Sequence, residues 1–158
     1  MAQKKTKETP ETVSRVRKTA GGGMKKEVER IQDSFYDALN NADIALMEKV
    51  WVPGSKAKCI HPGWPAIEGW DAIKASWISI FESGELASVE TSDIMIDVGE
   101  KAAWVNCIER LNHFVDGRIV VTLAQATNIF ENTEKGWRMT LHHASPVPIS
   151  TLSEGELQ

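Results

Sequence analysis

The residue in this chain best suited to proton transfer is Glu109. It falls in an alternating stretch whose residues of the same parity are apolar: Val105, Cys107 and Leu111. A carboxylate on an apolar strand face must be hydrogen-bonded or carry a shifted pKa, because an unpaired buried charge is costly. If that face lines a pocket, Glu109 is the candidate general base. If it faces outward, Glu109 is expected to pair with a cation such as Arg138.

Two adjacent histidines, His142 and His143, lie in a later alternating stretch. Neighbouring strand residues point to opposite faces, so only one of the two can enter a pocket and they cannot bind one metal ion together. His143 shares parity with Met139 and Leu141, whereas the parity of His142 is more polar. The pattern predicts that His143 is the interior histidine and a candidate acid or base, with Ser145 as its partner or as a ligand contact. A histidine with purely structural hydrogen bonds is the alternative.

Five further residues are candidate ligand contacts: Tyr36, His61, Trp64, Trp77 and Asn128. His61 opens a loop stiffened by two prolines, where it could act near neutral pH or simply cap the loop, and Trp64 could cover a pocket. Asn128 lies among small residues, where it could bind a ligand or satisfy another buried polar group. Trp77 could form an aromatic wall, although such helical positions are more often core. Tyr36 is the only tyrosine.

The two cysteines, Cys59 and Cys107, lie in apolar runs and form no CxxC motif. This pattern favours two buried free thiols over a disulfide or a metal pair. The sequence contains no metal-ligand spacing, no phosphate-binding glycine motif and no nucleophile motif. We therefore expect neither a metal ion nor a cofactor.

Composition limits the kinds of partner. The 158 residues carry a formal net charge of −4 and a pI near 5.6, which argues against general electrostatic binding of nucleic acid. No apolar run approaches the ~18 residues of a membrane span, and the N-terminus lacks the apolar region of a secretory signal. We expect a cytoplasmic protein that binds neither nucleic acid nor membranes.

The order of periodic segments predicts one α+β domain. Residues 1–23 are basic and end in three glycines, so we expect a disordered tail and linker; 24–149 form the domain and 150–158 a second tail. Apolar residues at helical spacing predict three helices, at 24–39, 44–50 and 70–83, with Asp43 as the N-cap of the second. A short strand is expected at 56–60, and four longer strands joined by short turns follow to residue 146, with a hairpin at Asp116-Gly117. The helices should pack on one face of this curved antiparallel sheet.

Several motifs in this order resemble the SnoaL-like branch of the nuclear transport factor 2-like superfamily, which has the ketosteroid isomerase-like fold. They are Asn40-Asn-Ala-Asp43, Cys59-Ile-His-Pro-Gly63, Trp104-Val-Asn-Cys-Ile-Glu109, Ala126-Thr-Asn-Ile-Phe130 and Gly136 to Ser145. The last is also similar to the association domain of calcium/calmodulin-dependent protein kinase II. Both resemblances imply a cone with a deep internal pocket, and usually a homodimer formed through the sheet. The superfamily includes isomerases, cyclases, dehydratases, transport adaptors and oligomerisation modules, so the resemblance specifies the fold and not the function.

The resemblance to ketosteroid isomerases does not extend to their active site. Those enzymes use a first-helix tyrosine, which Tyr36 matches in position, together with two aspartates. Asp93 and Asp97 are the nearest candidates, but their parity is opposite to that of the apolar residues and places them in solvent. The catalytic pair therefore has no counterpart.

Three functions remain open from the sequence. The first is a dimeric domain that binds a small apolar molecule through His61, Glu109, Asn128 and His143. The second is a cofactor-independent isomerase, cyclase or dehydratase in which Glu109 or His143 takes a proton. The third is a dimerisation or association module with a vestigial pocket.

Overall fold

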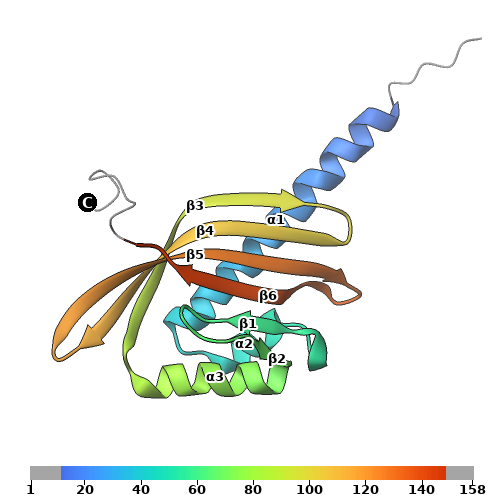
Figure 1. The fold of residues 1–158 in the computed structure, drawn as a ribbon. Helices are drawn as coiled ribbons and strands as arrows, with labels where there is room; N and C mark the ends of the chain where they lie inside the picture. Colours follow the sequence, from blue (N-terminus) through green and yellow to red (C-terminus); the bar gives the residue numbers. More distant parts are fainter. Residues whose placement is uncertain (1–11, 149–158) are drawn as a thin grey trace, which may run out of the picture.

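The computed structural model describes residues 12–148 and has the predicted α+β architecture (Figure 1). Its helices are α1 (Thr12–Asn40), α2 (Ile44–Val50) and α3 (Trp70–Ser83), with a 3-10 turn at Gly54–Lys56. Its strands are β1 (Lys58–Ile60), β2 (Ile67–Glu68), β3 (Leu86–Val98), β4 (Ala102–Val115), β5 (Arg118–Thr133) and β6 (Gly136–Pro146). They form one sheet in the order β2-β1-β6-β5-β4-β3. Strands β3 to β6 make the predicted antiparallel meander, and β1 pairs in parallel with β6.

Helix α1 is longer than the sequence predicts. It begins at Thr12 and runs through Gly21–Gly23, so the expectation of an unstructured linker there is wrong. The packed half of the helix, where Val28 and Phe35 are fully buried, supplies the nucleus. Extending an existing helix through a glycine costs only about 1 kcal/mol, far less than starting a new one. The expectations for residues 1–11 and for the C-terminal tail lie outside the described residues.

Local capping sets the ends of the two shorter helices. The predicted N-cap of α2, Asp43, accepts a hydrogen bond from the backbone N–H of Leu46 at 2.9 Å. Helix α3 ends at Gly84, whose φ of 65° is the left-handed conformation that favours glycine. The turn at Gly84 connects α3 to β3.

A β-bulge in β6 changes which of its residues face the helices. Ile129 of β5 pairs with Leu141, but the next β5 residue, Phe130, pairs with Met139, which leaves Thr140 as an extra residue. One extra residue reverses the alternation of side chains beyond it. As a result Met139 and His142 both lie on the buried face, although they are an odd number of residues apart.

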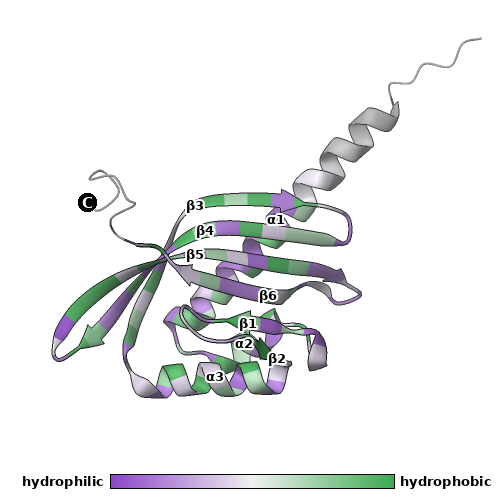
Figure 2. Cartoon of the chain, in the orientation of Figure 1, coloured by the Kyte–Doolittle hydropathy of each residue, from purple (hydrophilic) through white to green (hydrophobic). Residues whose placement is uncertain are grey.

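The sheet has an inner face, which packs against α1 and α3, and an outer face. On β4 the buried inner residues alternate with more exposed outer ones, as Val105 and the 46%-exposed Trp104 show. The inner face is solid at one end, which we call the packed end, where Phe35, Trp51, Phe130 and Met139 are buried. Near the β4–β5 hairpin, whose strands end in exposed apolar residues (Figure 2), the inner face is hollow. We call this the hollow end.

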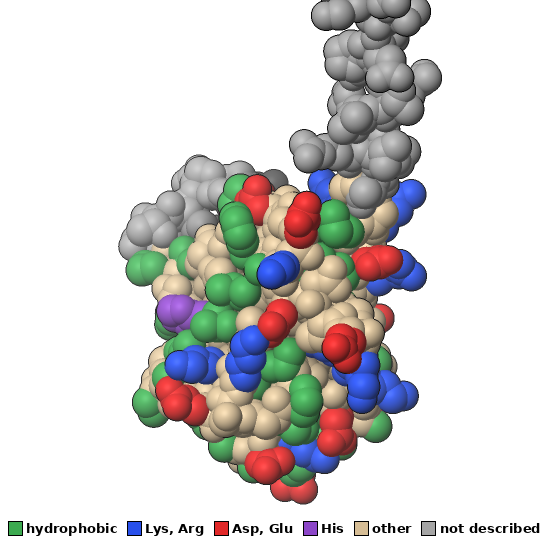
Figure 3. Space-filling view, turned by 90° about the vertical axis from the view of Figure 1, so that its right-hand side faces the viewer, with side chains coloured by type: hydrophobic (Ala, Val, Ile, Leu, Met, Phe, Trp, Pro, Cys, Tyr) green, Lys and Arg blue, Asp and Glu red, His purple; other side chains and the backbone are tan. Residues whose placement is uncertain are grey.

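The exterior carries both signs of charge. Figure 3 views the molecule from the side on which the β3–β4 and β5–β6 turns lie, and basic and acidic side chains are interspersed there. Within residues 12–148, no helix combines the length and the apolar character required to cross a bilayer.

Candidate functional site

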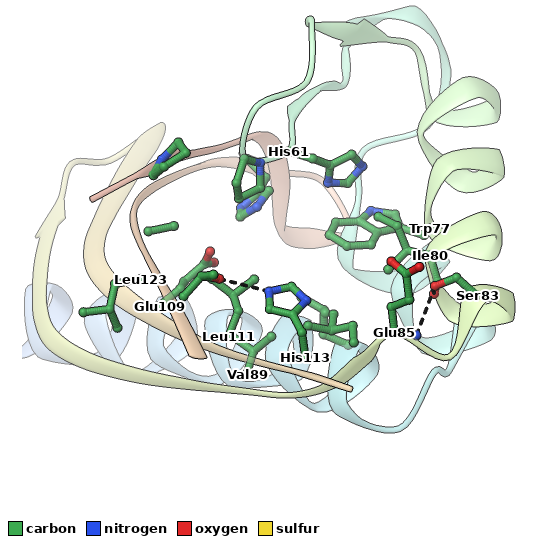
Figure 4. A pocket seen from close by; sticks show the side chains of 17 residues that line it. His61, Trp77, Ile80, Ser83, Glu85, Val89, Glu109, Leu111, His113 and Leu123 are labelled. Atoms are coloured by element: carbon green, nitrogen blue, oxygen red, sulfur yellow. Dashed lines mark hydrogen bonds between the residues drawn. The ribbon is translucent and has the colours of Figure 1, made fainter. Parts of the chain in front are cut away.

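The hollow end contains a cavity of about 370 Å³ between α3, the loop after β1 and the inner faces of β3 to β6 (Figure 4). Much of its wall is apolar and includes Trp77, Ile80, Leu86, Val89, Leu111 and Leu123. Three polar residues in the wall are almost fully buried: His61, Glu109 and His142. Glu85 and Thr122, which also line the cavity, are exposed and therefore mark its mouth.

Glu109 is held at the base of the cavity by the first helix. Its parity on β4 points the carboxyl group inward, where Tyr36 of α1 donates a hydrogen bond to Oε1 at 2.7 Å. Burial raises the pKa of Glu109 to about 7, and the bond from Tyr36 opposes that rise only in part. Near neutral pH both the acid and the carboxylate are therefore populated, which suits a group that exchanges protons. The alternative expectation, that Glu109 pairs with a cation on the outside, is wrong.

Asn128 links Glu109 to a histidine on β6. Its amide N–H groups donate to the Tyr36 hydroxyl at 3.2 Å and to Oε1 of Gln32 at 3.0 Å. Its amide oxygen is therefore the acceptor for Nδ1 of His142, 2.7 Å away. The result is a buried chain of hydrogen bonds from His142 through Asn128 and Tyr36 to Glu109. We call these four residues, with Gln32, the polar network.

Both buried histidines are neutral at neutral pH. Burial lowers the pKa of His142 to about 3 and that of His61 to about 4. Because Nδ1 of neutral His142 carries the proton donated to Asn128, its Nε2 atom carries a lone pair. His61 has the opposite tautomer: Ser76 donates its hydroxyl proton to the Ile73 carbonyl at 2.7 Å, so Nε2 of His61 must donate to Ser76 at 2.9 Å.

The structure brings most of the predicted site residues together. His61, Trp77 and Glu109 line the cavity, and Tyr36 and Asn128 lie directly behind it. Trp64 is 46% exposed and is not a wall residue, although its ring makes an edge contact with His61 at 5.1 Å between centroids.

Two predicted residues face away from the cavity. His143 and Ser145 are exposed, and the expectation that they point inward is wrong because the bulge at Thr140 exchanges the faces. His142 occupies the interior position instead. The sequence alone gave no sign of that bulge.

Gln32 is the second residue that the sequence analysis missed. It lies four residues before Tyr36 and four after Val28, on the buried stripe of α1, and is 3% exposed. A polar residue on a buried helical stripe is a usable signal, because such a group needs a hydrogen-bond partner. Cys59 and Cys107 are buried free thiols, as predicted. Nowhere in the described part of the chain do three or more potential metal ligands gather.

Comparison with known proteins supports the fold described above. The family model of the SnoaL-like domain matches residues 28–150. The chain belongs to the SnoaL-like domain family. The match covers α2, α3, all six strands and the packed half of α1, so the predicted resemblance to this family is confirmed.

Two solved structures of the same fold are similar to this SnoaL-like domain. A proposed dehydratase of the NTF2-like family from Streptomyces avermitilis has 27% identity and a TM-score of 0.70, covering 78% of this chain and 96% of that one. A proposed calcium/calmodulin-dependent protein kinase type II association domain from Thiobacillus denitrificans has 29% identity and a TM-score of 0.67, covering 76% and 94%.

A curated relative is longer than this chain. The F-box protein SKIP8 of Arabidopsis thaliana is 24% identical over 115 residues, which are 73% of this chain and 47% of that protein. The SnoaL-like chain thus spans about half the length of this relative.

Proposed function

We propose that this SnoaL-like domain binds a small, largely apolar molecule in the cavity at the hollow end. One observation carries the proposal: the polar network ends on two groups, Glu109 and His142, that line an otherwise largely apolar cavity of about 370 Å³. Concave apolar sites with a few convergent polar groups are the usual form of small-molecule sites, and this volume lies within their range.

The polar network supports a binding role over simple packing. Replacing both partners of a buried hydrogen bond by apolar groups of the same shape is often neutral or stabilising, so packing alone does not require such a network. Here each network residue fixes the next, from Gln32 on α1 to His142 on β6. The arrangement holds the Glu109 carboxyl group in one orientation at the cavity wall, which is what recognition of a ligand requires.

A thermal-shift screen tests the proposal. We would screen steroids, polyketides, small carboxylates and small amines against the wild type, and against Leu111→Trp, which places a large ring in the cavity. Ile108→Trp, at an outer position of β4 three residues before Leu111, is the control. A ligand at a hundred times its Kd should stabilise the fold by about 2.7 kcal/mol in the wild type and the control, and much less in Leu111→Trp. Equal stabilisation of all three proteins would place binding elsewhere, and no hit at all would reject the proposal.

A second candidate function is a proton-transfer enzyme, and the pKa of Glu109 near 7 favours it. The similarity to the proposed dehydratase from Streptomyces avermitilis points the same way. In this reading Glu109 takes or gives the proton and the neutral His142 holds the substrate. With a substrate from the screen, Glu109→Gln should lower kcat by about a hundredfold or more while binding persists. Turnover unaffected by this substitution would exclude the enzyme reading.

A homodimer through the outer face is the third part of the proposal. Large apolar side chains are exposed on the outer face of β3 and β4, among them Met95 and Trp104. The similarity to the proposed association domain from Thiobacillus denitrificans supports self-association. Sedimentation velocity should show a dimer for the wild type and a monomer for Trp104→Lys, with Glu134→Gln at the β5–β6 turn as a control that makes the same change in net charge. A monomeric wild type at high concentration would reject the dimer.

A further inference from the structure

Two hydrogen-bond acceptors at the base of the cavity have no partner within residues 12–148. Tyr36 uses its single proton on Oε1 of Glu109, which leaves Oε2 without a donor. His142 uses its Nδ1 proton on Asn128, which leaves the lone pair of Nε2 without a donor. Neither atom is among the fully enclosed polar atoms without a partner, and both residues line the cavity, so both acceptors are open to a ligand.

The same wall offers few donors to a ligand. The Nε2 proton of His61 is committed to Ser76, and the hydroxyl of Ser83 donates to the Ile80 carbonyl at 2.8 Å. The indole N–H of Trp77 has no partner among the described residues, but it is fully enclosed and so is not open to the cavity. The single hydrogen bond between His113 and Thr122, at 2.9 Å, uses one proton of the pair and leaves a donor near the mouth. A ligand whose polar end is a carbonyl or a carboxylate would therefore find few partners, whereas a ligand that donates hydrogen bonds would find two.

The charges around the cavity have one sign. No lysine or arginine is among its wall residues, while Glu109 lies at its base and Glu85 at its mouth (Figure 4). Both buried wall histidines are neutral, as shown above. An anionic ligand would meet repulsion without compensation, and a cation would be attracted. The indole of Trp77 in the same wall is a side chain of the type that attracts cations.

We infer that the ligand of this cavity is an amine: a small apolar body that carries one protonated amino group, which donates hydrogen bonds to Oε2 of Glu109 and Nε2 of His142. An ammonium group has donors and no acceptor, which complements the two open acceptors at the base of the cavity. The carboxylate of Glu109 is then the counter-ion, and Tyr36 holds it in place. The inference rests on the proposed ligand-binding function and adds the chemical class of the ligand.

Three compounds with one apolar body test the amine directly: 4-phenylbutylamine, 4-phenylbutan-1-ol and 4-phenylbutyrate. Titration calorimetry at pH 8 keeps Glu109 largely ionised and the amine protonated. The wild type should bind the amine about tenfold more tightly than the alcohol, and the carboxylate least. Alcohol or carboxylate binding as tight as that of the amine would overturn the inference.

Two matched variants locate the preference. Glu109→Gln should weaken amine binding by about tenfold or more and change alcohol binding less than about threefold, because it removes the charge and keeps the shape. Glu100→Gln, in the exposed β3–β4 turn and outside the cavity wall, should change both by less than about threefold. An amine preference that survives Glu109→Gln would also overturn the inference.

The outcomes separate this inference from the proposed function. If the alcohol or the carboxylate binds and the amine does not, the cavity remains a ligand site and the amine is rejected. If none of the three binds, the amine is likewise rejected, and the broader thermal-shift screen decides the ligand-binding function on its own. The wild-type series alone settles the preference, so a variant that failed to fold would not obscure it.

Discussion

The packed end and the hollow end of the inner sheet face are built from the same elements, yet one is solid and the other encloses a cavity. At the packed end, aromatic rings from α1 and from the C-cap residue of α2 meet the sheet, and Phe35 lies 6.3 Å from Trp51 between ring centroids. At the hollow end, β4 and β5 continue beyond the helices, so Leu111 and Leu123 stay partly exposed. The polar network lies at the boundary between the two ends. The packed end thus holds in place the polar groups that line the cavity at the hollow end.

The largest expected loss of stability comes from a substitution at the packed end, and a matching substitution at the hollow end should cost much less. Phe35→Ala removes a fully buried ring at the packed end and should lower the free energy of unfolding by about 4 kcal/mol. Leu111→Ala removes a partly exposed side chain that already borders a cavity, so we expect a loss of about 1 kcal/mol. Urea unfolding followed by circular dichroism measures both. Equal losses would show that the hollow end is packed in solution.

Substitutions of the adjacent residues His142 and His143 compare the inner and outer faces of β6. His142→Ala should cost about 3 kcal/mol, because it leaves a void and deprives the Asn128 amide oxygen of its donor. His143→Ala, on the exposed side of the same strand, should cost less than about 0.5 kcal/mol. The same urea measurement applies. A larger loss of stability for His143→Ala than for His142→Ala would mean that the bulge is not at Thr140.

The pH dependence of stability tests the buried carboxyl group. In the fold the pKa of Glu109 is raised from 4.5 to about 7, so between these values the folded state holds a proton that the unfolded state releases. The free energy of unfolding contributed by Glu109 therefore falls as pH rises through this window. Glu109→Gln does not titrate, so it should gain on the wild type by about 2 to 3 kcal/mol from pH 4.5 to 7.5.

The two buried histidines titrate in both proteins and cancel in this difference. Their pKa values are lowered by burial, so by themselves they reduce stability as pH falls below about 6.5 in the wild type and in the variant alike. Unfolding curves at a series of pH values give the difference at each pH. A difference that stays constant would mean that the carboxyl group is not buried in solution.

The smallest expected loss of stability comes from removing the hydroxyl group of Tyr36. Tyr36→Phe removes the donor to Glu109 and the acceptor of Asn128 but keeps the ring, so a loss of about 1 to 2 kcal/mol is expected. Ser145→Ala, which removes a hydroxyl group from the exposed end of β6, is the control and should change stability by less than about 0.5 kcal/mol. Similar losses for the two variants would contradict the polar network.

The sequence predicted the elements well because their signals are local. The periodic apolar stripe of α1, the Asp43 cap and the Asp116-Gly117 turn each depend on a few neighbouring residues. Strand parity also grouped Glu109 and Asn128 with the apolar and small residues of their strands, and it left open whether the face of Glu109 lines a pocket. The grouping holds in the fold because no bulge interrupts the pairing of β4 with β5. Both residues belong to the polar network for that reason.

Features that depend on distant segments could not be predicted. A bulge is set by how β6 meets β5, so parity alone assigned the interior to the wrong histidine. Three consecutive glycines have low helix propensity, so the sequence there favours a linker. Helix α1 nevertheless continues through them because its packed half is already formed. The choice between a paired cation and a tyrosine for Glu109 required the path of α1 across the sheet.

The parallel pairing of β1 with β6 has a consequence for when the cavity can form. Cys59 lies opposite His142, and the backbone N–H of Val52 donates to the Met139 carbonyl at 2.9 Å, so the segment leading to His61 is anchored on the final strand. Such pairings between sequence-distant segments carry a large loop-closure entropy and tend to form slowly. On the ribosome, the wall that holds His61 would have to wait until almost the whole domain has emerged. A nascent chain that stops before β6 would lack the strand that anchors the segment leading to His61, and with it the closed wall of the cavity.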